Sequence, residues 1–126
     1  MFDHLLVILY VADMGRSLAL YRDIFGGEET YRFPREGAPE HVELRIGSAT
    51  LALTSEAGRQ AHHLPPASSG NPFELAVRTT DADAAMAALV AANCSPLLEP
   101  FDSSAGNRVA YVLDPDGNRI QIYSRS

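Results

Sequence analysis

The sequence predicts an α+β fold made of two tandem βαβββ modules, which form a cupped mixed sheet around a cleft with the helices outside. Two observations predict this fold. An aspartate placed to cap a helix occurs at Asp13 and again 68 residues later at Asp81. A turn glycine occurs at Gly47 and again 70 residues later at Gly117. Spacing this regular indicates two copies of one structural unit.

The first module contains four predicted strands and one predicted helix. Residues 4–12 form an uninterrupted apolar run that is typical of a buried strand. Residues 13–25 follow with apolar side chains at helical spacing, and the pair Gly26 and Gly27 ends this helix. Further strands are predicted at residues 28–33, 41–46 and 49–55, because apolar and polar residues alternate there.

A linker is predicted at about residues 57–72, between a first module at about 1–56 and a second at about 73–126 of a single domain, 1–126. Prolines, serines and glycine leave this stretch nothing to pack. His62 and His63 lie within it. Adjacent histidines can bind a metal, but no third ligand is near in sequence, so a solvated loop is expected.

The second module repeats the order of the first. Residues 73–80 alternate as a strand, a helix is predicted at about 81–92, and Asn93 is suited to end it. Residues 95–101 contain prolines that suit an edge strand. The last two strands are joined by a turn in which Asp114 is expected to accept hydrogen bonds from backbone amides. After the turn, Gln121 and Tyr123 alternate with two isoleucines.

Composition excludes several classes of protein. The chain has 126 residues and a formal charge of −6, which argues against a nucleic-acid partner. No apolar run approaches the roughly 20 residues of a membrane span, and the N-terminus has no basic region of a signal peptide. The single cysteine, Cys94, cannot form an internal disulfide and is expected to be buried and inert. A cytoplasmic protein without a membrane partner is expected.

Four stretches of the sequence carry a recognisable pattern: a VxD helix start at Val11, the helix end YRDIFG, the segment TTDADAA and the terminal hairpin DPDGNRIQIY. Together they resemble the vicinal oxygen chelate superfamily, which includes glyoxalase I, extradiol dioxygenases and the fosfomycin and bleomycin resistance proteins. The resemblance covers essentially the whole chain. It implies a homodimer, a cleft, and in the metalloenzymes a divalent metal held by one ligand from the first and one from the last strand of each module.

The resemblance places the four metal-ligand positions at Leu6, Ala52, Glu74 and Gln121. The internal repeat supports this register, because Leu6 to Ala52 spans 46 positions and Glu74 to Gln121 spans 47. Leucine and alanine cannot coordinate a metal, and glutamine offers only a neutral carbonyl oxygen. A divalent metal needs about three or more protein ligands. The sequence therefore predicts no metal and no cofactor.

Strand parity predicts the lining of the cleft. The expected ligand-binding residues are Leu6, Ile8, Tyr10, Ala52, Thr54, Glu74, Arg78, Tyr111, Gln121 and Tyr123. Tyr111 is ambiguous, and His41, Glu43 and Arg45 have a parity that fits either the cleft or solvent. His4 is too far along its strand to replace Leu6. A close contact is expected between Glu74 and Gln121, whose amide can donate a hydrogen bond to the carboxylate.

Three classes of function follow. The first is a metal-independent protein that binds a small molecule, such as a drug or toxin, as the bleomycin-resistance type does. The second is a metal-dependent lyase or dioxygenase of the glyoxalase kind. The third is an enzyme that uses Glu74 as a general base, since a carboxylate partly removed from water suits that role. The poor ligand set favours the first class.

Overall fold

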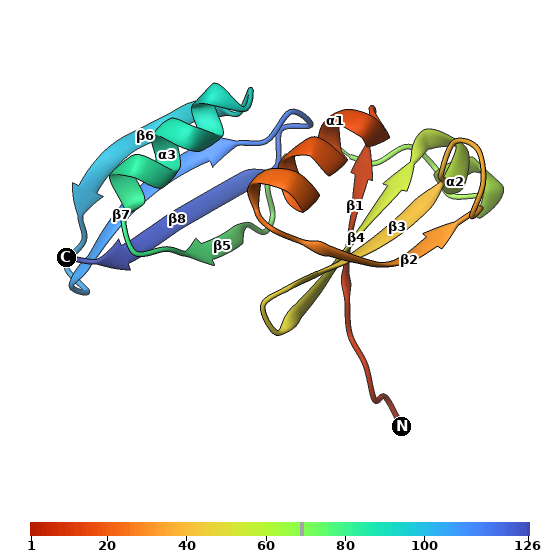
Figure 1. Ribbon diagram of the computed structural model, residues 1–126, viewed down its shortest axis with the longest axis horizontal. Coiled ribbons are helices and arrows are strands. Elements are labelled where there is room, and N and C mark those ends of the chain that lie inside the picture. Colours follow the sequence, from red (N-terminus) through yellow and green to blue (C-terminus); the bar gives the residue numbers. More distant parts are fainter. Residues whose placement is uncertain (69) are drawn as a thin grey trace. The chain divides into compact units, whose positions relative to one another are not determined.

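Each half of the chain forms a four-stranded mixed sheet with a helix on one face (Figure 1). The structure is a computed structural model that describes residues 1–68 and 70–126. The chain divides into two compact units, Met1–Ser68 and Ser69–Ser126. The two units have the same order of strands, which confirms the predicted repeat of a βαβββ module.

The first unit has the strand order β1-β4-β3-β2, with β1 parallel to β4 and the other pairs antiparallel. Its elements are β1 (Val7–Val11), α1 (Met14–Leu18), the π-helix η1 (Ala19–Ile24), β2 (Glu28–Phe33), β3 (His41–Ile46), β4 (Ala49–Ser55) and α2 (Glu56–Ala61). The second unit has the order β5-β8-β7-β6, with β5 parallel to β8. Its elements are β5 (Leu75–Arg78), α3 (Ala82–Ala91), β6 (Ser95–Asp102), β7 (Asn107–Leu113) and β8 (Arg119–Arg125).

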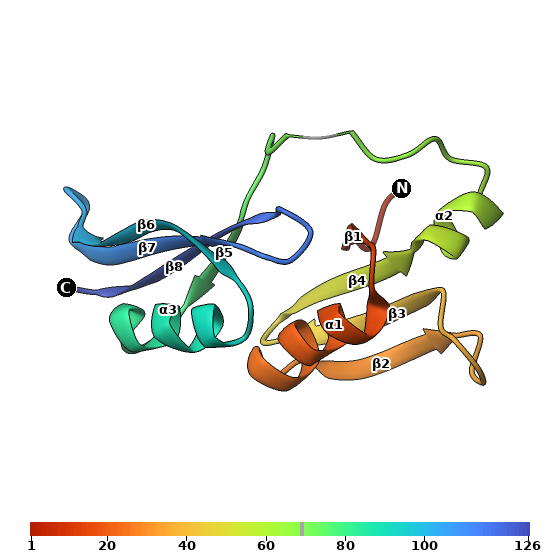
Figure 2. The same ribbon diagram turned by 90° about the horizontal axis from the view of Figure 1, so that it is seen from above.

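Alternation along the strands separates a helix-covered face from an open face in each sheet (Figure 2). In the first unit the helix-covered face buries aliphatic side chains, including Leu9, Val42, Leu44, Leu51 and Leu53. In the second unit Ala110, Val112, Ile120 and Ile122 are buried together with Met86 and Leu89 of α3. Burying one such Leu, Ile or Met side chain contributes about 1.5–3 kcal/mol, so this face stabilises each unit.

The two aspartates predicted to cap helices do so. Asp13 accepts a hydrogen bond from the backbone amide of Arg16, and Asp81 accepts one from the amide of Ala84, each at 3.0 Å. Asn93 has a φ of 74° at the end of α3, as expected for a residue that ends a helix in the left-handed conformation. The local signals in the sequence therefore fix where both helices begin and where the second one ends.

The helix predicted over residues 13–25 changes type half-way. α1 ends at Leu18, and η1 continues it as a π-helix in which the amide of Phe25 donates to the carbonyl of Leu20 at 2.9 Å. The wider turn still leaves Tyr21 fully buried against the sheet. Gly26, with a φ of 76°, then turns the chain towards β2.

The prediction of an unpacked linker is wrong at its beginning. Residues Glu56–Ala61 form α2, which starts at Ser55, whose hydroxyl accepts a hydrogen bond from the amide of Gly58 at 3.1 Å. Arg59 is only 8% exposed. Gly58 allows this packing because a Cβ there would lie 2.6 Å from the carbonyl oxygen of Glu40. α2 therefore lies close to the start of β3.

The outer strands β2 and β6 pair irregularly with their neighbours. The register of β2 against β3 shifts between Glu29 and Tyr31. The register of β6 against β7 shifts twice between Pro96 and Phe101, and β6 is an edge strand as its prolines predicted. Within the described ranges, 1–68 and 70–126, the structure has no helix that is both apolar enough and long enough to cross a membrane.

Candidate functional site

The two sheets share one hydrogen-bonding register, which tests the alignment of the expected ligand positions. Ile8 pairs with Ala52 in the first sheet, and Ala76 pairs with Gln121 in the second. Leu6 and Glu74 each lie two residues before the paired residue of the first strand. The structure therefore confirms that Leu6 and Ala52 are the equivalents of Glu74 and Gln121.

Three polar side chains meet on the open face of the second sheet. The side-chain amide of Gln121 donates to a carboxylate oxygen of Glu74 at 3.0 Å and to the hydroxyl oxygen of Tyr111 at 2.7 Å. Gln121 and Tyr111 are half-buried, and they are paired residues of β8 and β7. Glu74 is exposed and lies just before β5. The predicted contact between Gln121 and Glu74 is confirmed, and Tyr111 joins it.

Both amide hydrogens of Gln121 are used in this arrangement. A primary amide has two N–H donors, and they are directed to the carboxylate and to the phenol oxygen. The carboxylate of Glu74 keeps one oxygen, and the phenol keeps its own O–H, for other partners. The cluster therefore presents a fixed acceptor and a fixed donor side by side on the open face.

These residues do not fit the divalent metal that the resemblance implies. Glu74 is the only anionic oxygen ligand in its cluster, and the amide nitrogen rather than the carbonyl oxygen of Gln121 faces it. The equivalents in the first unit, Leu6 and Ala52, have no donor atom. Over residues 1–68 and 70–126 no three His, Cys, Asp or Glu side chains are grouped so that they could hold a metal ion.

A pocket of about 450 Å³ lies on the open face of the first sheet. It is lined by Ile8, Tyr10, Tyr31, Phe33, Glu40, His41, Glu43, Thr54, Gly58, Arg59, Ala61, His62 and Leu64. Four strands and the helix α2 contribute to it, so the wall is built from the whole unit. Three of the expected cleft residues, Ile8, Tyr10 and Thr54, belong to this lining.

His41 is held between two partners inside this pocket. Its Nε2 donates to the carboxylate of Glu43 at 2.9 Å, and its Nδ1 lies 3.0 Å from the hydroxyl oxygen of Thr54. A carboxylate only accepts hydrogen bonds, so Nε2 carries a proton, and in the neutral imidazole Nδ1 accepts from Thr54. All three side chains are less than one third exposed. Strand alternation alone allowed His41 and Glu43 to face either the cleft or solvent. The structure places both of them in the lining of this pocket.

Arg59 also lines the pocket, and its positive charge is balanced by an ion pair with Glu56. Its guanidinium donates two hydrogen bonds to the carboxylate of Glu56 and one to the carbonyl of Leu64. The hydrogen bonds that Arg59 donates to Glu56 raise the pKa of Arg59, and the same contact lowers the pKa of Glu56. The ion pair fixes α2 and the segment after it, so Arg59 orders the wall and its charge is balanced.

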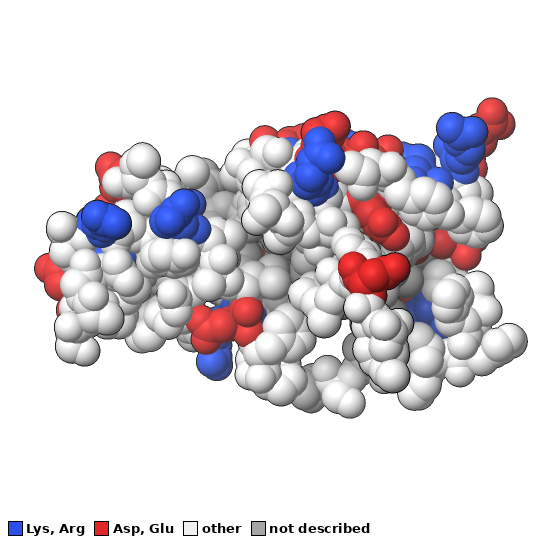
Figure 3. Space-filling view, turned by 90° about the horizontal axis from the view of Figure 1, so that it is seen from below, with Lys and Arg blue, Asp and Glu red and all other residues white. Residues whose placement is uncertain are grey.

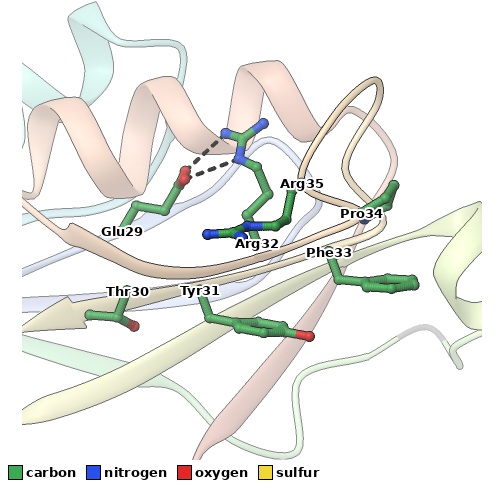
Figure 4. A pocket seen from close by; sticks show the side chains of 7 residues that line it. All are labelled: Glu29, Thr30, Tyr31, Arg32, Phe33, Pro34 and Arg35. Carbon is green, nitrogen blue, oxygen red and sulfur yellow. Dashed lines mark hydrogen bonds and ion pairs between the residues drawn. The ribbon is translucent and has the colours of Figure 1, made fainter.

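A larger open groove, about 680 Å³, follows the outer strand β2 (Figure 4). It is lined by residues 29–35 alone. Figure 4 shows the Glu29–Arg32 ion pair on one side of the strand and the rings of Tyr31 and Phe33 on the other. Because one continuous segment supplies every lining residue, no groups from different elements converge on a ligand there.

The remaining expected site residues belong neither to the cluster of Gln121, Glu74 and Tyr111 nor to the pocket around His41. Leu6 is half-buried before β1, and Ala52 is fully buried in β4. Arg78 is exposed and Tyr123 half-buried, and they are paired residues of β5 and β8. His4 and His63 are exposed. A cleft that uses all ten expected residues stays a prediction, as does Glu74 as a general base.

Sequence reasoning missed Tyr31, Phe33 and all of α2. The signal for the two rings was present, because they are separated by one residue and so share a face of a strand. The signal for α2 was weaker: Ser55 followed by Glu56 suits a helix start, but a glycine and two prolines follow. Cys94 is buried as expected, and burial, then Asp114, raises the pKa of its thiol to about 11.

Comparison with known proteins agrees with this fold and register. The family model of the glyoxalase/bleomycin resistance protein/dioxygenase superfamily matches residues 1–122. The chain belongs to this superfamily. No curated protein matches the chain significantly.

Solved structures share this fold at low sequence identity. A family enzyme from Burkholderia phytofirmans PsJN is 20% identical with a TM-score of 0.81, and 95% of this chain and 96% of that one align. TioX from Micromonospora sp. ML1 is 20% identical with a TM-score of 0.75, over 99% and 100% of the two chains. A mutant of the fosfomycin resistance protein FosX from Listeria monocytogenes, complexed with Mn(II), is 16% identical with a TM-score of 0.73, over 100% and 93%.

Proposed function

We propose that the protein binds an organic small molecule and does so without a resident metal. The pocket on the open face of the first sheet carries this proposal. It combines apolar and aromatic walls with a few polar groups held by hydrogen bonds, which is how small-molecule sites are built. Its volume of about 450 Å³ suits a drug-sized ligand.

The ligand class is supported by the relatives. FosX proteins of the same fold are named for resistance to fosfomycin, and one was solved with Mn(II). In the present chain leucine, alanine and glutamine occupy three of the four positions that the resemblance assigns to metal ligands. We therefore propose binding of a drug or toxin, as in the bleomycin-resistance type, rather than metal-dependent conversion of it.

The purified protein is expected to contain no stoichiometric Zn, Ni, Fe or Mn. The physical reason is the donor set, in which Glu74 is the only strong ligand of the four positions. Inductively coupled plasma mass spectrometry of protein purified without chelator measures the metal content. About one metal per chain, lost in Glu74→Ala, would contradict the proposal and restore the metalloenzyme hypothesis.

The cluster on the second sheet gives a second test of the binding proposal. Gln121→Ala removes both hydrogen bonds that order Glu74 and Tyr111. A ligand that contacts this cluster is expected to bind about 1–3 kcal/mol more weakly to the variant, because a carboxylate is left short of a partner. The ligand would come from a thermal-shift screen of drug-like compounds, and isothermal titration calorimetry would measure its affinity.

Gln121→Glu is the matched variant, since it keeps the side-chain length and places two carboxylates together. Two carboxylates in one site raise the pKa of one of them, so ligand binding is expected to become dependent on pH near neutrality and some metal affinity is expected. If both Gln121 variants bind every ligand as the wild type does, the cluster is not part of the site.

We also propose that the protein is a homodimer. The family resemblance implies one, and each sheet has two edge strands whose outer hydrogen-bonding groups have no partner strand within that sheet. Sedimentation equilibrium at tens of micromolar is expected to give about twice the chain mass of 13.6 kDa. A species of 13.6 kDa at that concentration would refute the dimer.

A further inference from the structure

We infer that the pocket of the first unit recognises an organic cation that also carries an aromatic or apolar group. This inference rests on the proposed function, since it names the ligand class of the same pocket. Two features carry it, the number of aromatic rings in the wall and the sign of the charges that remain unbalanced there.

Aromatic side chains enter the pocket from three different strands. Tyr10 comes from β1, Tyr31 and Phe33 from β2, and the imidazole of His41 from β3. Tyr31 and His41 stand edge to face, with ring centroids 6.0 Å apart. Figure 4 shows the rings of Tyr31 and Phe33 on the same side of β2. Phenol and phenyl faces carry negative charge density, so rings grouped in this way attract a cation.

The charged groups of the pocket also favour a cation. Glu40 and Glu43 are acidic residues of the lining, and Glu43 uses one of its carboxylate oxygens to hold His41. Arg59 is the one arginine of the lining that the structure describes. All three nitrogens of its guanidinium already donate, two of them to Glu56, so its charge does not oppose a cation. A carboxylate close to aromatic faces is the arrangement that recognises ammonium groups.

The imidazole of His41 and the exposed imidazole of His62 also face this pocket. Apart from these imidazoles, the described part of the lining contains two acidic residues and one arginine, whose charge is balanced by Glu56. Figure 3 shows acidic and arginine side chains distributed over one face of the molecule, some in mixed groups and some alone.

The test compares two probes of one shape and different charge. Phenyltrimethylammonium is a cation at every pH, and tert-butylbenzene is its neutral isostere. Calorimetric titration of the intact chain at pH 8 is expected to show at least about tenfold tighter binding of the cation, through ring and carboxylate contacts. The preference is expected to shrink as salt is raised from 20 to about 300 mM, because the charge contribution is screened.

Four substitutions locate the cation. Glu43→Gln keeps an acceptor for His41 and removes the charge, and it is expected to abolish most of the tenfold preference. Tyr31→Leu is expected to reduce it about fivefold, while Tyr31→Phe keeps the ring face and most of the preference. Glu28→Gln is the matched control, since it removes one negative charge from the same unit at a surface ion pair with Arg45, outside the pocket.

Each outcome decides the inference. A cation preference that falls in Glu43→Gln and Tyr31→Leu and is retained in Glu28→Gln supports it. Equal binding of both probes, reduced by the same substitutions, overturns the inference while leaving the pocket a small-molecule site. A cation preference unchanged in Glu43→Gln, or no binding of either probe, overturns it for this pocket. The thermal-shift screen of drug-like compounds then judges the proposed function separately.

Discussion

Gly27→Ala is expected to lower the free energy of unfolding by about 3 kcal/mol. Gly27 is buried where the chain passes from η1 to β2. A Cβ at this position would lie 2.6 Å from the carbonyl oxygen of Tyr21 and 3.3 Å from side-chain atoms of Leu44 and Ile46. The carbonyl belongs to the π-helix and accepts the amide of Gly27 itself at 3.1 Å, so it has little freedom to move away.

Gly15→Ala is the matched control for this prediction. Gly15 lies in α1, and a Cβ there would meet only a carboxylate oxygen of Asp13, at 3.5 Å, an ordinary contact. Alanine in a helix is favoured over glycine, so this variant is expected to gain about 0.5–1 kcal/mol. Urea unfolding followed by circular dichroism measures both. A Gly27→Ala variant as stable as the wild type would contradict the prediction, because it would show that the backbone between η1 and β2 can shift to accommodate a Cβ.

Asp114→Ala is expected to cost about 3 kcal/mol of stability. Asp114 is 3% exposed, and one of its carboxylate oxygens accepts the backbone amides of Asp116 and Asn118 at 2.9 and 2.7 Å. Its other oxygen accepts from the side-chain amide of Asn118 at 2.9 Å. Alanine leaves these three donors without their acceptor in the turn that joins β7 to β8.

Asp114→Asn separates shape from hydrogen bonding. The asparagine oxygen can still accept the two backbone amides, but its NH₂ group replaces the oxygen that faces the side-chain amide of Asn118. A loss of about half that of alanine is expected, measured by the same urea transitions. The interpretation fails if Asp114→Ala unfolds within about 0.5 kcal/mol of the wild type, the range of an ordinary surface change.

The sequence determined the architecture because its strongest signals are local. Asp13 and Asp81 cap helices through contacts with residues three positions away, so their effect needs no knowledge of the fold. Alternation in residues 41–46 and 119–125 similarly assigns side chains to opposite faces. The repeat of these signals was enough to predict two equivalent sheets.

Two elements escaped prediction because their stability is tertiary. Nothing in the pattern of residues 19–24 distinguishes a π-helix from an α-helix, since the choice depends on how Tyr21 and Gly27 fit the sheet. α2 contains glycine, a poor helix former, and it is held by the contact of Gly58 with Glu40 and by the ion pair of Arg59 with Glu56. Such contacts are visible only in the folded chain.

One part of the candidate site could be predicted from the sequence and the other could not, because only the first depends on local register. The contact of Gln121 with Glu74 could be predicted because the repeat fixes the register of two neighbouring strands. The pocket around His41 could not, because parity says that His41, Glu43 and Thr54 share a face but not which neighbours enclose them. Tyr31 and Phe33 come from an outer strand with a register shift, which periodicity alone does not locate.

The irregular pairing of β2 and β6 limits how this chain can aggregate. A growing fibril recruits each new strand through an unbroken row of backbone donors and acceptors. The shifts at Glu29–Tyr31 and between Pro96 and Phe101 make β2 and β6, two of the four outer strands, irregular, and the prolines of β6 lack backbone donors. Edge-to-edge polymerisation through these two strands is therefore self-terminating, although Leu97, Leu98 and Phe101 leave β6 with exposed apolar side chains.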